Sequence, residues 1–399
     1  MERLFSYVLI DNEGNIFNEP DLSEKQMDVH EAMLAFNWLN AQEWVSSGND
    51  INELEYYKFN VTERDPSKKV EKGQFFTRSN PFTHELFKKW INMEGIRDEK
   101  ILEPFAGANH IVKMIQDIGK NNQWDCYDIN PPKENCTPEF QVIERDTIKA
   151  FPQGYKICIT NPPYLGKSSA RKKKLNYEWE EDDLYKHCLK LMLENCGYVA
   201  AIIPESFITS NFPKDRLWGV ISLAYKMFDD TDCPVCLALF IPNKRTATDV
   251  YVNDERLGSL QRLLEISNEL LSFDCKENID NHKWAFNDPN GSIGVKTVDG
   301  ITEDNLCSFF EGEKINPEKI VVSARAYTRV SGLPENIDRK EFINLCNKLL
   351  NEYRKKTKDI TMTSFKGLRK DGKYRRRLDF KTVRAIMNKA LCMIINNAY

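Results

Sequence analysis

Long hydrophobic runs are missing from the 399-residue sequence. No stretch approaches the roughly 18 consecutive apolar residues that span a bilayer. The N-terminal segment has neither a basic leader nor a long apolar core, so we expect neither a membrane segment nor a signal peptide. The five histidines are few and dispersed, and they indicate no catalytic triad.

Paired metal-ligand spacings are also missing. The 11 cysteines are scattered, odd in number and mostly placed in apolar runs, which predicts buried free thiols in a reducing cytoplasm. Cys233 and Cys236 have C-x-x-C spacing, but no second cysteine or histidine pair accompanies them. Structural zinc needs four ligands, so we expect no metal site.

Charge is unevenly distributed along the chain. The composition is 41% hydrophobic and 29% charged, with a net charge of -4, which excludes disorder as the dominant state. Residues 1–70 carry 6 Lys/Arg against 14 Asp/Glu, whereas residues 351–399 carry 14 against 4. A basic end on an acidic chain indicates a polyanionic partner. On charge alone, a solvated basic helix surface explains the pattern equally well.

Strand and helix patterns alternate through the middle of the sequence, which predicts an α/β fold with a mostly parallel sheet and helices on both faces. The last two strands are joined too briefly for a helical crossover, so we expect them to be antiparallel. The alternation of strand and helix patterns ends near 243–250, which predicts a domain boundary there. The expected central strands are 101–102, 124–129, 140–144, 155–160, 198–204, 224–229 and 235–241; the expected helices are 111–118, 181–195 and 214–224. Outside this region we expect two strands within 5–17, helices at 23–46, 253–272, 337–358 and 380–396, and short β pieces between 280 and 333.

The tetrapeptide Asn161-Pro162-Pro163-Tyr164 directly follows an apolar strand. It should occur by chance in about one chain in a thousand of this length. Open parallel sheets bind ligands outside the carboxyl ends of their strands. A stiff turn there would hold an amide oxygen, a carbonyl oxygen and an aromatic face together, which suits a planar group bearing an amino group. The alternative is a simple turn, because Asn and Pro are turn residues.

Acidic residues end three further strands. Glu103 opens the small-residue loop 103–109, Asp128 ends the next strand, and Asp146 ends the one after. The loop has no G-x-G-x-x-G pattern, so pyrophosphate binding is not favoured. An acid at the end of the second strand is well placed for ribose hydroxyls. Each acid alone is more often a solvated strand end, but four polar strand ends in order are a stronger signal.

These residues resemble the S-adenosylmethionine-dependent amino-methyltransferases, specifically the N6-adenine DNA methyltransferases of restriction-modification systems in the gamma motif order. The resemblance covers about residues 70–243. It implies a Rossmann-like fold with a mostly parallel seven-stranded sheet and one antiparallel strand, followed by an α+β target-recognition region. The implied organisation is an N-terminal extension over 1–70 (a strand hairpin plus an acidic helix), a catalytic domain over 71–243 and a DNA-binding domain over 244–399.

The resemblance implies a role for each matching residue. Asp128 would bind the ribose and Asp146 the adenine of S-adenosyl-L-methionine, and Asp183-Leu184-Tyr185 would begin the helix after the catalytic loop. Tyr164 and Phe228 would pack on a flipped-out base. The implied catalytic residues are Asn161, Pro162, Pro163 and Tyr164; the implied cofactor-binding residues are Thr77, Glu103, Pro104, Phe105, Ala106, Gly107, Asp128, Ile129, Asp146 and Asn161.

Two basic segments are candidates for DNA binding. One follows the catalytic turn, and the other lies near the C-terminus with aromatic residues interleaved, a mixture that suits a DNA backbone. The alternative for the first segment is a solvated loop. The candidate residues are Lys167, Arg171, Lys172, Lys173 and Lys174, then Lys366, Arg369, Lys370, Lys373, Arg375, Arg376 and Arg377.

The expected partner is double-stranded DNA in the cytoplasm, at the nucleoid if the source is cellular, with no membrane and with a cognate restriction endonuclease acting separately. The same turn occurs in enzymes that methylate RNA adenine or a protein glutamine amide, and these remain alternatives. The basic C-terminal region favours DNA over both. A non-catalytic methyltransferase-like protein that binds nucleic acid is a further alternative, against which the intact tetrapeptide argues.

Overall fold

The computed structural model describes residues 80–172, 179–225, 227, 233–275, 282–320 and 326–396, and three short strands nearer the N-terminus. The chain divides into two compact units, Met1–Val70 and Glu71–Tyr399. In the first unit, β1 (Val8–Ile10) pairs antiparallel with β2 (Ile16–Phe17) and with β3 (Glu55–Tyr57), so two strands lie within 5–17 as expected. The helix expected over 23–46 lies outside the described residues.

A nine-stranded sheet organises the second unit, in the order β12-β11-β9-β10-β8-β7-β4-β5-β6. Its centre is parallel, because β7 pairs with β8, β4 with β7 and β5, and β5 with β6, all in the same direction. The strands are β4 (Ile101–Glu103), β5 (Trp124–Asp128), β6 (Val142–Glu144), β7 (Ile157–Thr160), β8 (Tyr198–Pro204), β9 (Leu217–Ser222), β10 (Val235–Phe240), β11 (Asp249–Val252) and β12 (Glu255–Ser259).

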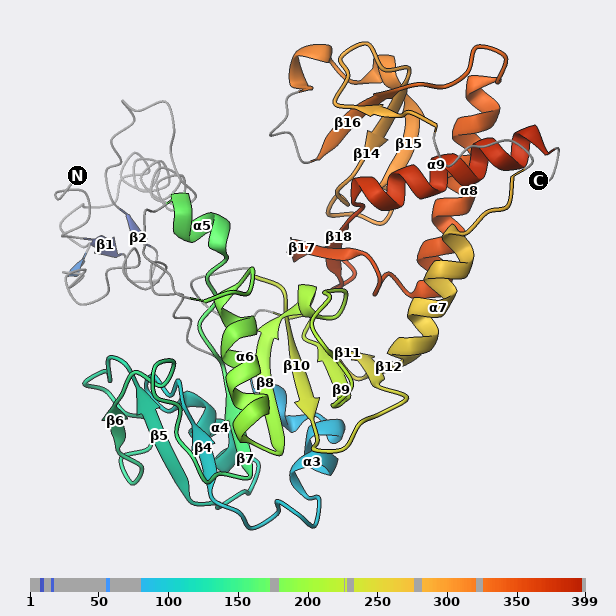
Figure 1. The fold of residues 1–399 in the computed structure, drawn as a ribbon. Helices are drawn as coiled ribbons and strands as arrows, with labels where there is room; N and C mark the ends of the chain where they lie inside the picture. Colours follow the sequence, from blue (N-terminus) through green and yellow to red (C-terminus); the bar gives the residue numbers. More distant parts are fainter. Residues whose placement is uncertain are drawn as a thin grey trace. The chain divides into compact units, whose positions relative to one another are not determined.

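Helices cover both faces of this sheet. Along the chain the strand order runs outward from β4 to β6 and then back through β7 to β8, and right-handed crossovers in opposite directions place their helices on opposite faces. Figure 1 shows α6 (Leu184–Asn195) on one face, with α3 (Glu85–Ile91) and α4 (His110–Asp117) on the other. Trp90 of α3 is fully buried, and its indole N–H donates to the carbonyl of Phe240 at 3.0 Å.

The strand β10 is antiparallel to both of its neighbours, β8 and β9. The strand at 235–241 was expected to be antiparallel to one at 224–229, and its antiparallel partner on that side is instead β9. The helix expected over 214–224 is wrong, because Leu217–Ser222 is the strand β9. Five of its six residues are buried, and an apolar run covered on both sides has no periodicity that separates a strand from a helix. The strand expected at 224–229 lies partly outside the described residues, and Ala224 and Tyr225 are not in a strand.

The hairpin β11–β12 extends the sheet beyond β9, with β11 parallel to β9. The helix expected over 253–272 is therefore shorter than predicted: it is α7 (Leu260–Leu271), and it begins after Ser259, whose hydroxyl caps it. The predicted boundary near 243 precedes these two strands of the nine-stranded sheet.

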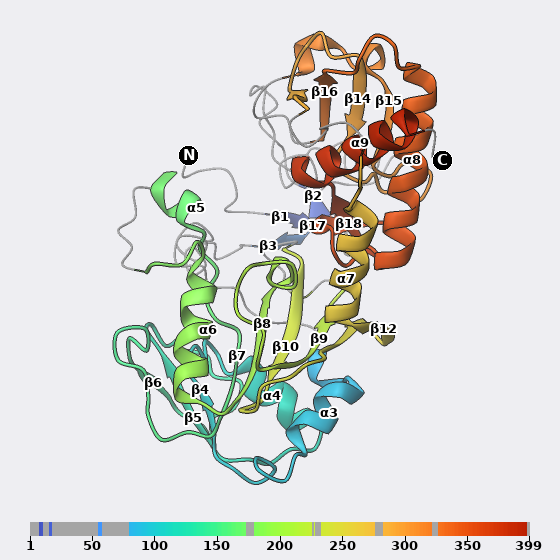
Figure 2. The same cartoon turned by 45° about the vertical axis from the view of Figure 1, so that its right-hand side comes forward.

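The remaining residues form a second hydrophobic core. A four-stranded sheet, in the order β13-β16-β14-β15, packs with α8 and α9 (Figure 2). A separate two-stranded hairpin pairs β17 with β18. The elements are β13 (Ala285–Phe286), β14 (Ile293–Lys296), β15 (Ser308–Glu311), β16 (Tyr327–Ser331), α8 (Arg339–Thr357), β17 (Thr363–Leu368), β18 (Tyr374–Arg377) and α9 (Phe380–Ile395). Short 3-10 turns are η3 (Pro81–Thr83), η4 (Glu205–Phe207), η6 (Gly312–Lys314) and η7 (Pro317–Lys319), and a six-residue helix, α5, spans Lys167–Lys172.

Within the described ranges, no helix combines the length and the apolar character that crossing a membrane requires. The same ranges contain no group of three or more His, Cys, Asp or Glu residues that could hold a metal ion. Cys236 is buried in β10 and Cys233 is half-buried beside it.

Candidate active site

Glu103 ends β4 and is almost completely buried, with 1% of its surface exposed. Its Oε1 accepts the backbone N–H of Phe105 at 3.1 Å and the hydroxyl of Thr160, the last residue of β7. Its Oε2 is buried and has no hydrogen-bond partner among the described residues. Burial raises the pKa of Glu103 to about 8, although the bonds from Thr160 and Phe105 act against this. The site therefore holds an unsatisfied carboxyl oxygen that would favour a cationic or hydrogen-donating guest.

The loop after Glu103 is fastened to the end of β5. Asp128 is buried, its Oδ2 accepts the N–H of Gly107 at 2.9 Å, and its Oδ1 accepts the N–H of Asn130 at 2.8 Å. Ala106 donates to the carbonyl of Tyr127 at 2.8 Å. Gly107 has a φ of +51°, a left-handed conformation that favours glycine. The lone pairs that remain on Asp128 make it a plausible ligand for hydroxyl groups.

Asp146 follows β6 and is half-buried. Its Oδ1 accepts the N–H of Lys149 at 3.2 Å. The next residue, Thr147, donates its hydroxyl to the carbonyl of Pro104 at 2.9 Å, which joins the loop after β6 to the loop after β4. Ile129 is 53% exposed, an unusually high value for a large apolar side chain. The predicted cofactor residues therefore lie at the carboxyl ends of four adjacent strands, β4, β5, β6 and, for Asn161, β7, whereas Thr77 lies outside the described residues.

The turn Asn161–Tyr164 leaves the carboxyl end of β7, the strand next to β4. Asn161 and Pro163 are half-buried, whereas Pro162 and Tyr164 are buried. The Tyr164 hydroxyl lies 2.5 Å from Asn161 Oδ1 and 2.6 Å from the carbonyl oxygen of Ile202, and both are acceptors. Burial raises the pKa of Tyr164 well above its usual range. With only 9% of Tyr164 exposed, a base can stack on its ring only after the ring is uncovered.

Asp183 connects the turn Asn161–Tyr164 to the helix behind it. It is the N-cap of α6, which begins at Leu184 as the resemblance implied. Its Oδ1 accepts the N–H of Tyr185 at 3.3 Å and the N–H of Leu165, the residue directly after the turn, at 3.1 Å. Burial raises the pKa of Asp183, while these two bonds act to lower it. Together with Thr160, Asp183 fixes both ends of the segment that carries Asn161.

The sequence signal for these two supporting residues was weak. Thr160 directly precedes Asn161, and a hydroxyl at that strand end is the only hint of its bond to Glu103. Asp183 was expected only as a helix start. Its second bond, to the turn, depends on a contact between residues 18 positions apart.

The basic segment after the turn is partly helical rather than a loop. Lys167 begins α5, is half-buried and donates through Nζ to the carbonyl of Glu180 at 2.5 Å. Arg171 and Lys172 are exposed. Lys173, Lys174 and the expected base-stacking residue Phe228 lie outside the described residues.

The C-terminal basic residues divide by exposure. Lys366, Lys370 and Lys373 are exposed on the hairpin β17–β18 and its turn, and Arg375 and Arg377 are half-buried. Arg375 lies over the ring of Phe365, 5.2 Å from its centroid. The side chains that are exposed or half-buried remain candidates for contact with phosphates.

Two of the arginines expected to bind DNA are instead buried, Arg369 at 8% and Arg376 at 4% exposure. Arg369 donates to Asp371 at 3.0 Å, and Arg376 pairs with Glu205 at 2.9 Å. A guanidinium that is desolvated and satisfied by carboxylates is not available to a phosphate. We therefore correct the expectation for these two residues.

The strand order, with one reversed strand beside β8, and the acids at three successive strand ends define a class I methyltransferase fold of the Rossmann-like type. S-adenosyl-L-methionine is the cofactor of this class. It fits the donor set, because it carries an ammonium for the unsatisfied Glu103 oxygen and vicinal hydroxyls for Asp128.

Comparison with known families gives a more particular likeness. Residues 75–218 match the sequence model of the Eco57I restriction-modification methylase family. This match confirms the resemblance to S-adenosylmethionine-dependent restriction-modification methyltransferases. No curated protein matches the chain.

Solved structures with low similarity were also found. One is a putative class I S-adenosylmethionine-dependent methyltransferase from Listeria monocytogenes, with 11% identity over 56% of this chain and 80% of that chain and a TM-score of 0.31. Another is a modification subunit of a putative type I restriction enzyme from Vibrio vulnificus, with 10% identity over 58% and 53% and a TM-score of 0.33. A third is a type I restriction-modification methyltransferase subunit from Streptococcus thermophilus, with 12% identity over 48% and 52% and a TM-score of 0.32. The matches span about half the length of these two type I subunits.

Proposed function

We propose that the protein transfers a methyl group from S-adenosylmethionine to the exocyclic N6 of an adenine flipped out of duplex DNA, as the modification enzyme of a restriction-modification system. In this proposal, residues 71–243 carry the reaction and residues 244–399 recognise the target. The proposal depends on one observation above all: the Asn161 turn leaves the sheet directly beside the strand that presents Glu103.

The donor side is supported by the strand-end acids. Glu103 would bind the ammonium of the cofactor, Asp128 its ribose hydroxyls and Asp146 its adenine amino group, with Ile129 against the adenine ring. When bound, the cofactor supplies an electrophilic sulfonium methyl group. The buried carboxyl of Glu103 would become ionised next to the ammonium, because an opposite charge favours the charged form.

The acceptor side is supported by the chemistry of the turn. An adenine amino group is a poor nucleophile, because its lone pair is delocalised into the ring. The Oδ1 of Asn161 and the carbonyl oxygen of Pro162 would each accept a hydrogen bond from the amino group. These two bonds would draw the nitrogen toward tetrahedral geometry. Transfer would then be a direct displacement that depends on positioning and electrostatics. The bond from N6 to the methyl carbon would form as the bond from that carbon to the sulfonium sulfur breaks, the thioether product would leave, and N6 would lose one proton to solvent. It requires no covalent enzyme intermediate.

Base flipping has a structural requirement at Tyr164. A base inside a duplex cannot reach such a turn, and extruding it costs roughly a few kcal/mol. The Tyr164 hydroxyl contacts the same Asn161 oxygen that would receive the amino group. We therefore expect the incoming base to displace this contact and to uncover the tyrosine ring for stacking.

Label transfer tests the proposal directly. Purified protein is incubated with S-adenosylmethionine carrying a labelled methyl group and with unmethylated duplex DNA, and the digested nucleosides are identified by mass spectrometry. We expect label on N6-methyladenine. Label on RNA or on protein glutamine, with the DNA unlabelled, would replace the proposal by one of these alternatives.

The variant Asn161→Ala tests the assigned role. It should lower transfer by at least about a hundredfold, because an acceptor aimed at the reacting group is lost, while cofactor affinity measured by calorimetry stays within about threefold. Asn92→Ala, which removes an exposed asparagine at the end of α3, is the matched control and should retain full activity. Near-normal turnover of Asn161→Ala would refute the role.

A further inference from the structure

The strand β18 presents two different faces. Tyr374 and Arg376 are buried, whereas Arg375 and Arg377, at the alternate positions, are half-buried. Successive side chains of a strand point to opposite sides. Tyr374 donates its hydroxyl to the carbonyl of Leu223 at 2.6 Å, directly after β9. One face of β18 therefore contacts the catalytic sheet, and the other does not share these contacts.

Arg376 makes the stronger of these contacts. Its Nη1 lies 2.9 Å from Oε2 of Glu205 and its Nη2 lies 3.2 Å from Oε1, a two-pronged arrangement. Glu205 is 3% exposed and also accepts the hydroxyl of Ser222. Burying two charges costs several kcal/mol of desolvation each, and removing one partner leaves the other uncompensated. The pair is therefore stable only while Arg376 and Glu205 stay in place, so a small shift of either element would destabilise it.

Glu205 lies close to the catalytic turn along the chain. It follows Pro204, the last residue of β8, and its N–H donates to the carbonyl of Pro234 at 2.9 Å. Ala201 of β8 pairs with Thr160, the residue before Asn161. The carbonyl of Ile202 is the one that the Tyr164 hydroxyl contacts. Glu205 is thus three residues beyond a direct contact with the turn.

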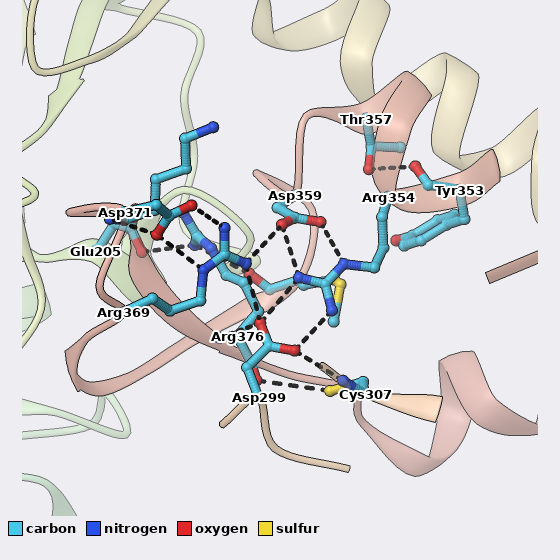
Figure 3. A network of polar contacts seen from close by, with 12 residues as sticks. Glu205, Asp299, Cys307, Tyr353, Arg354, Thr357, Asp359, Arg369, Asp371 and Arg376 are labelled. Carbon is cyan, nitrogen blue, oxygen red and sulfur yellow. Dashed lines mark hydrogen bonds and ion pairs between the residues drawn. The ribbon is translucent and has the colours of Figure 1, made fainter. Parts of the chain in front are cut away.

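The other end of the connection is equally fixed. The backbone N–H of Arg376 donates to Asp299 Oδ2 at 3.0 Å, and its carbonyl accepts the N–H of Asp299 at 2.9 Å. Asp299 is fully buried, and its two carboxylate oxygens accept hydrogen bonds from Nη1 and Nη2 of Arg354 at 2.7 and 2.9 Å. Figure 3 shows how this network continues from Arg354 through Asp359 to Arg369. The hairpin β17–β18 is therefore tied to the helix α8 as well as to the catalytic sheet.

We propose that the Glu205–Arg376 pair positions the basic hairpin β17–β18 relative to the Asn161 turn, so that DNA held by the hairpin presents its target base to the turn. This inference rests on the proposed function. It makes Arg376 a positioning residue that acts through Glu205. The candidates for DNA contact are then the residues displayed around it, Lys370 and Lys373 at the hairpin turn and Arg375 on the strand.

Single-turnover kinetics and hydrogen exchange test the proposal in the full chain. Arg376→Gln and Glu205→Gln, each shown to be folded by circular dichroism, should slow methyl transfer at saturating DNA by about tenfold to a hundredfold, the effect of a misplacement of about 1 Å. DNA affinity should stay within about threefold. The amides of 363–368 and 374–377 should exchange faster. Arg376→Lys, which keeps the charge but loses the two-pronged geometry, should lie between these variants and the wild type.

Three further variants sharpen the test. The double variant Glu205→Gln/Arg376→Gln should be slowed no more than either single variant, because residues that act as a unit are not additive. Arg339→Gln removes an arginine from an exposed ion pair, 2.6 Å from Glu313, and should change neither rate nor exchange. Lys373→Gln, which removes an exposed charge at the hairpin turn, is the contrast, with weaker DNA binding and a smaller salt dependence.

Either of two results would overturn the proposal. One is faster exchange with an unchanged transfer rate, which would make the pair only a structural support. The other is unchanged exchange with weaker, less salt-dependent DNA binding, which would make Arg376 a phosphate ligand. If the wild type methylates RNA or protein instead, the rates are compared on that substrate. If the wild-type protein methylates nothing, the proposed function fails, and with it the predicted effect on transfer. Hydrogen exchange of the hairpin amides then decides by itself whether the Glu205–Arg376 pair anchors the hairpin.

Discussion

The chemistry of the Glu103 carboxyl is altered by its burial. Burial raises its pKa to about 8, so the ligand-free protein holds it protonated at neutral pH. In the unfolded chain a glutamate ionises near 4.5. Between these two values the folded state binds one proton more than the unfolded state, and its stability falls as the pH rises.

This difference predicts a pH dependence of stability. From pH 5 to pH 8, Glu103 should lower the free energy of unfolding by at most about 1.4 kcal/mol per pH unit, and the Glu103→Gln variant should lack this component. The measurement is urea unfolding of both proteins at several pH values without cofactor. Parallel curves would show that Glu103 is already ionised in the folded protein.

Saturation with S-adenosylmethionine provides a second readout at the same residue. An ammonium beside Glu103 favours the carboxylate, so the cofactor should flatten the wild-type slope more than the slope of Glu103→Gln. An equal effect on both proteins would place the ammonium elsewhere.

Not every residue assignment could come from the sequence. The strand-end acids were predictable, because their positions follow from the end of each apolar strand. The burial of Arg376 was not, because its partner Glu205 is 171 positions away. A run of basic residues indicates charge but does not reveal which side chains face inward. The aspartates of the Arg354 and Arg369 network, spread over residues 299–371, gave no local signal either.

At the scale of elements, the helix α6 and the Asn161 turn are held by one capping residue. The carboxylate of Asp183 serves the helix N-terminus and the N–H of Leu165 together. Asp183→Ala should cost about 1 kcal/mol of stability, as the loss of an N-cap does, and should also slow methyl transfer, because the segment after Tyr164 loses its anchor. Asp183→Asn keeps an acceptor oxygen and should recover most of both.

A second N-cap separates the two effects. Asp338 is exposed and caps α8 through a bond of 2.7 Å from the N–H of Glu341. Asp338→Ala should lose a similar amount of stability, measured by urea unfolding, with no change in transfer rate. Equal rates for Asp183→Ala and Asp338→Ala would mean that the cap does not support the turn.

The type of an element was predictable wherever the spacing of its apolar residues agreed with the capping and turn residues at its ends. The helices α4, α6, α8 and α9 were expected within a few residues of their observed ends, because apolar residues recur at helical spacing. The strand β9 was taken for a helix, since a fully covered apolar segment has no polar face to reveal its period. The hairpin β17–β18 was not anticipated, because its residues are mostly polar and two of its charges point inward.

At the scale of the whole molecule, the positive charge near the C-terminus predicts the salt dependence of DNA binding. Each phosphate contact contributes about 0.9 to the slope of log affinity against log salt concentration. Lys370→Gln/Lys373→Gln should therefore reduce the slope by up to about 2. Fluorescence anisotropy with labelled duplex DNA over a salt series measures this slope.

The matched control removes the same charge elsewhere. Lys314 and Lys319 are exposed near the four-stranded sheet, and Lys314→Gln/Lys319→Gln should leave most of the slope intact. Equal losses in the two double variants would assign the effect to net charge rather than to contacts made by the hairpin.

The two-residue period of β18 has a consequence for how target preference can diverge. A substitution at Arg377 should leave the anchor in place, whereas Arg375 also donates to the carbonyl of Asp299 at 2.7 Å, and Arg376 must be inherited together with Glu205. Exchange of recognition segments between relatives should therefore yield active chimaeras only when the donor segment brings an arginine that the recipient glutamate can receive.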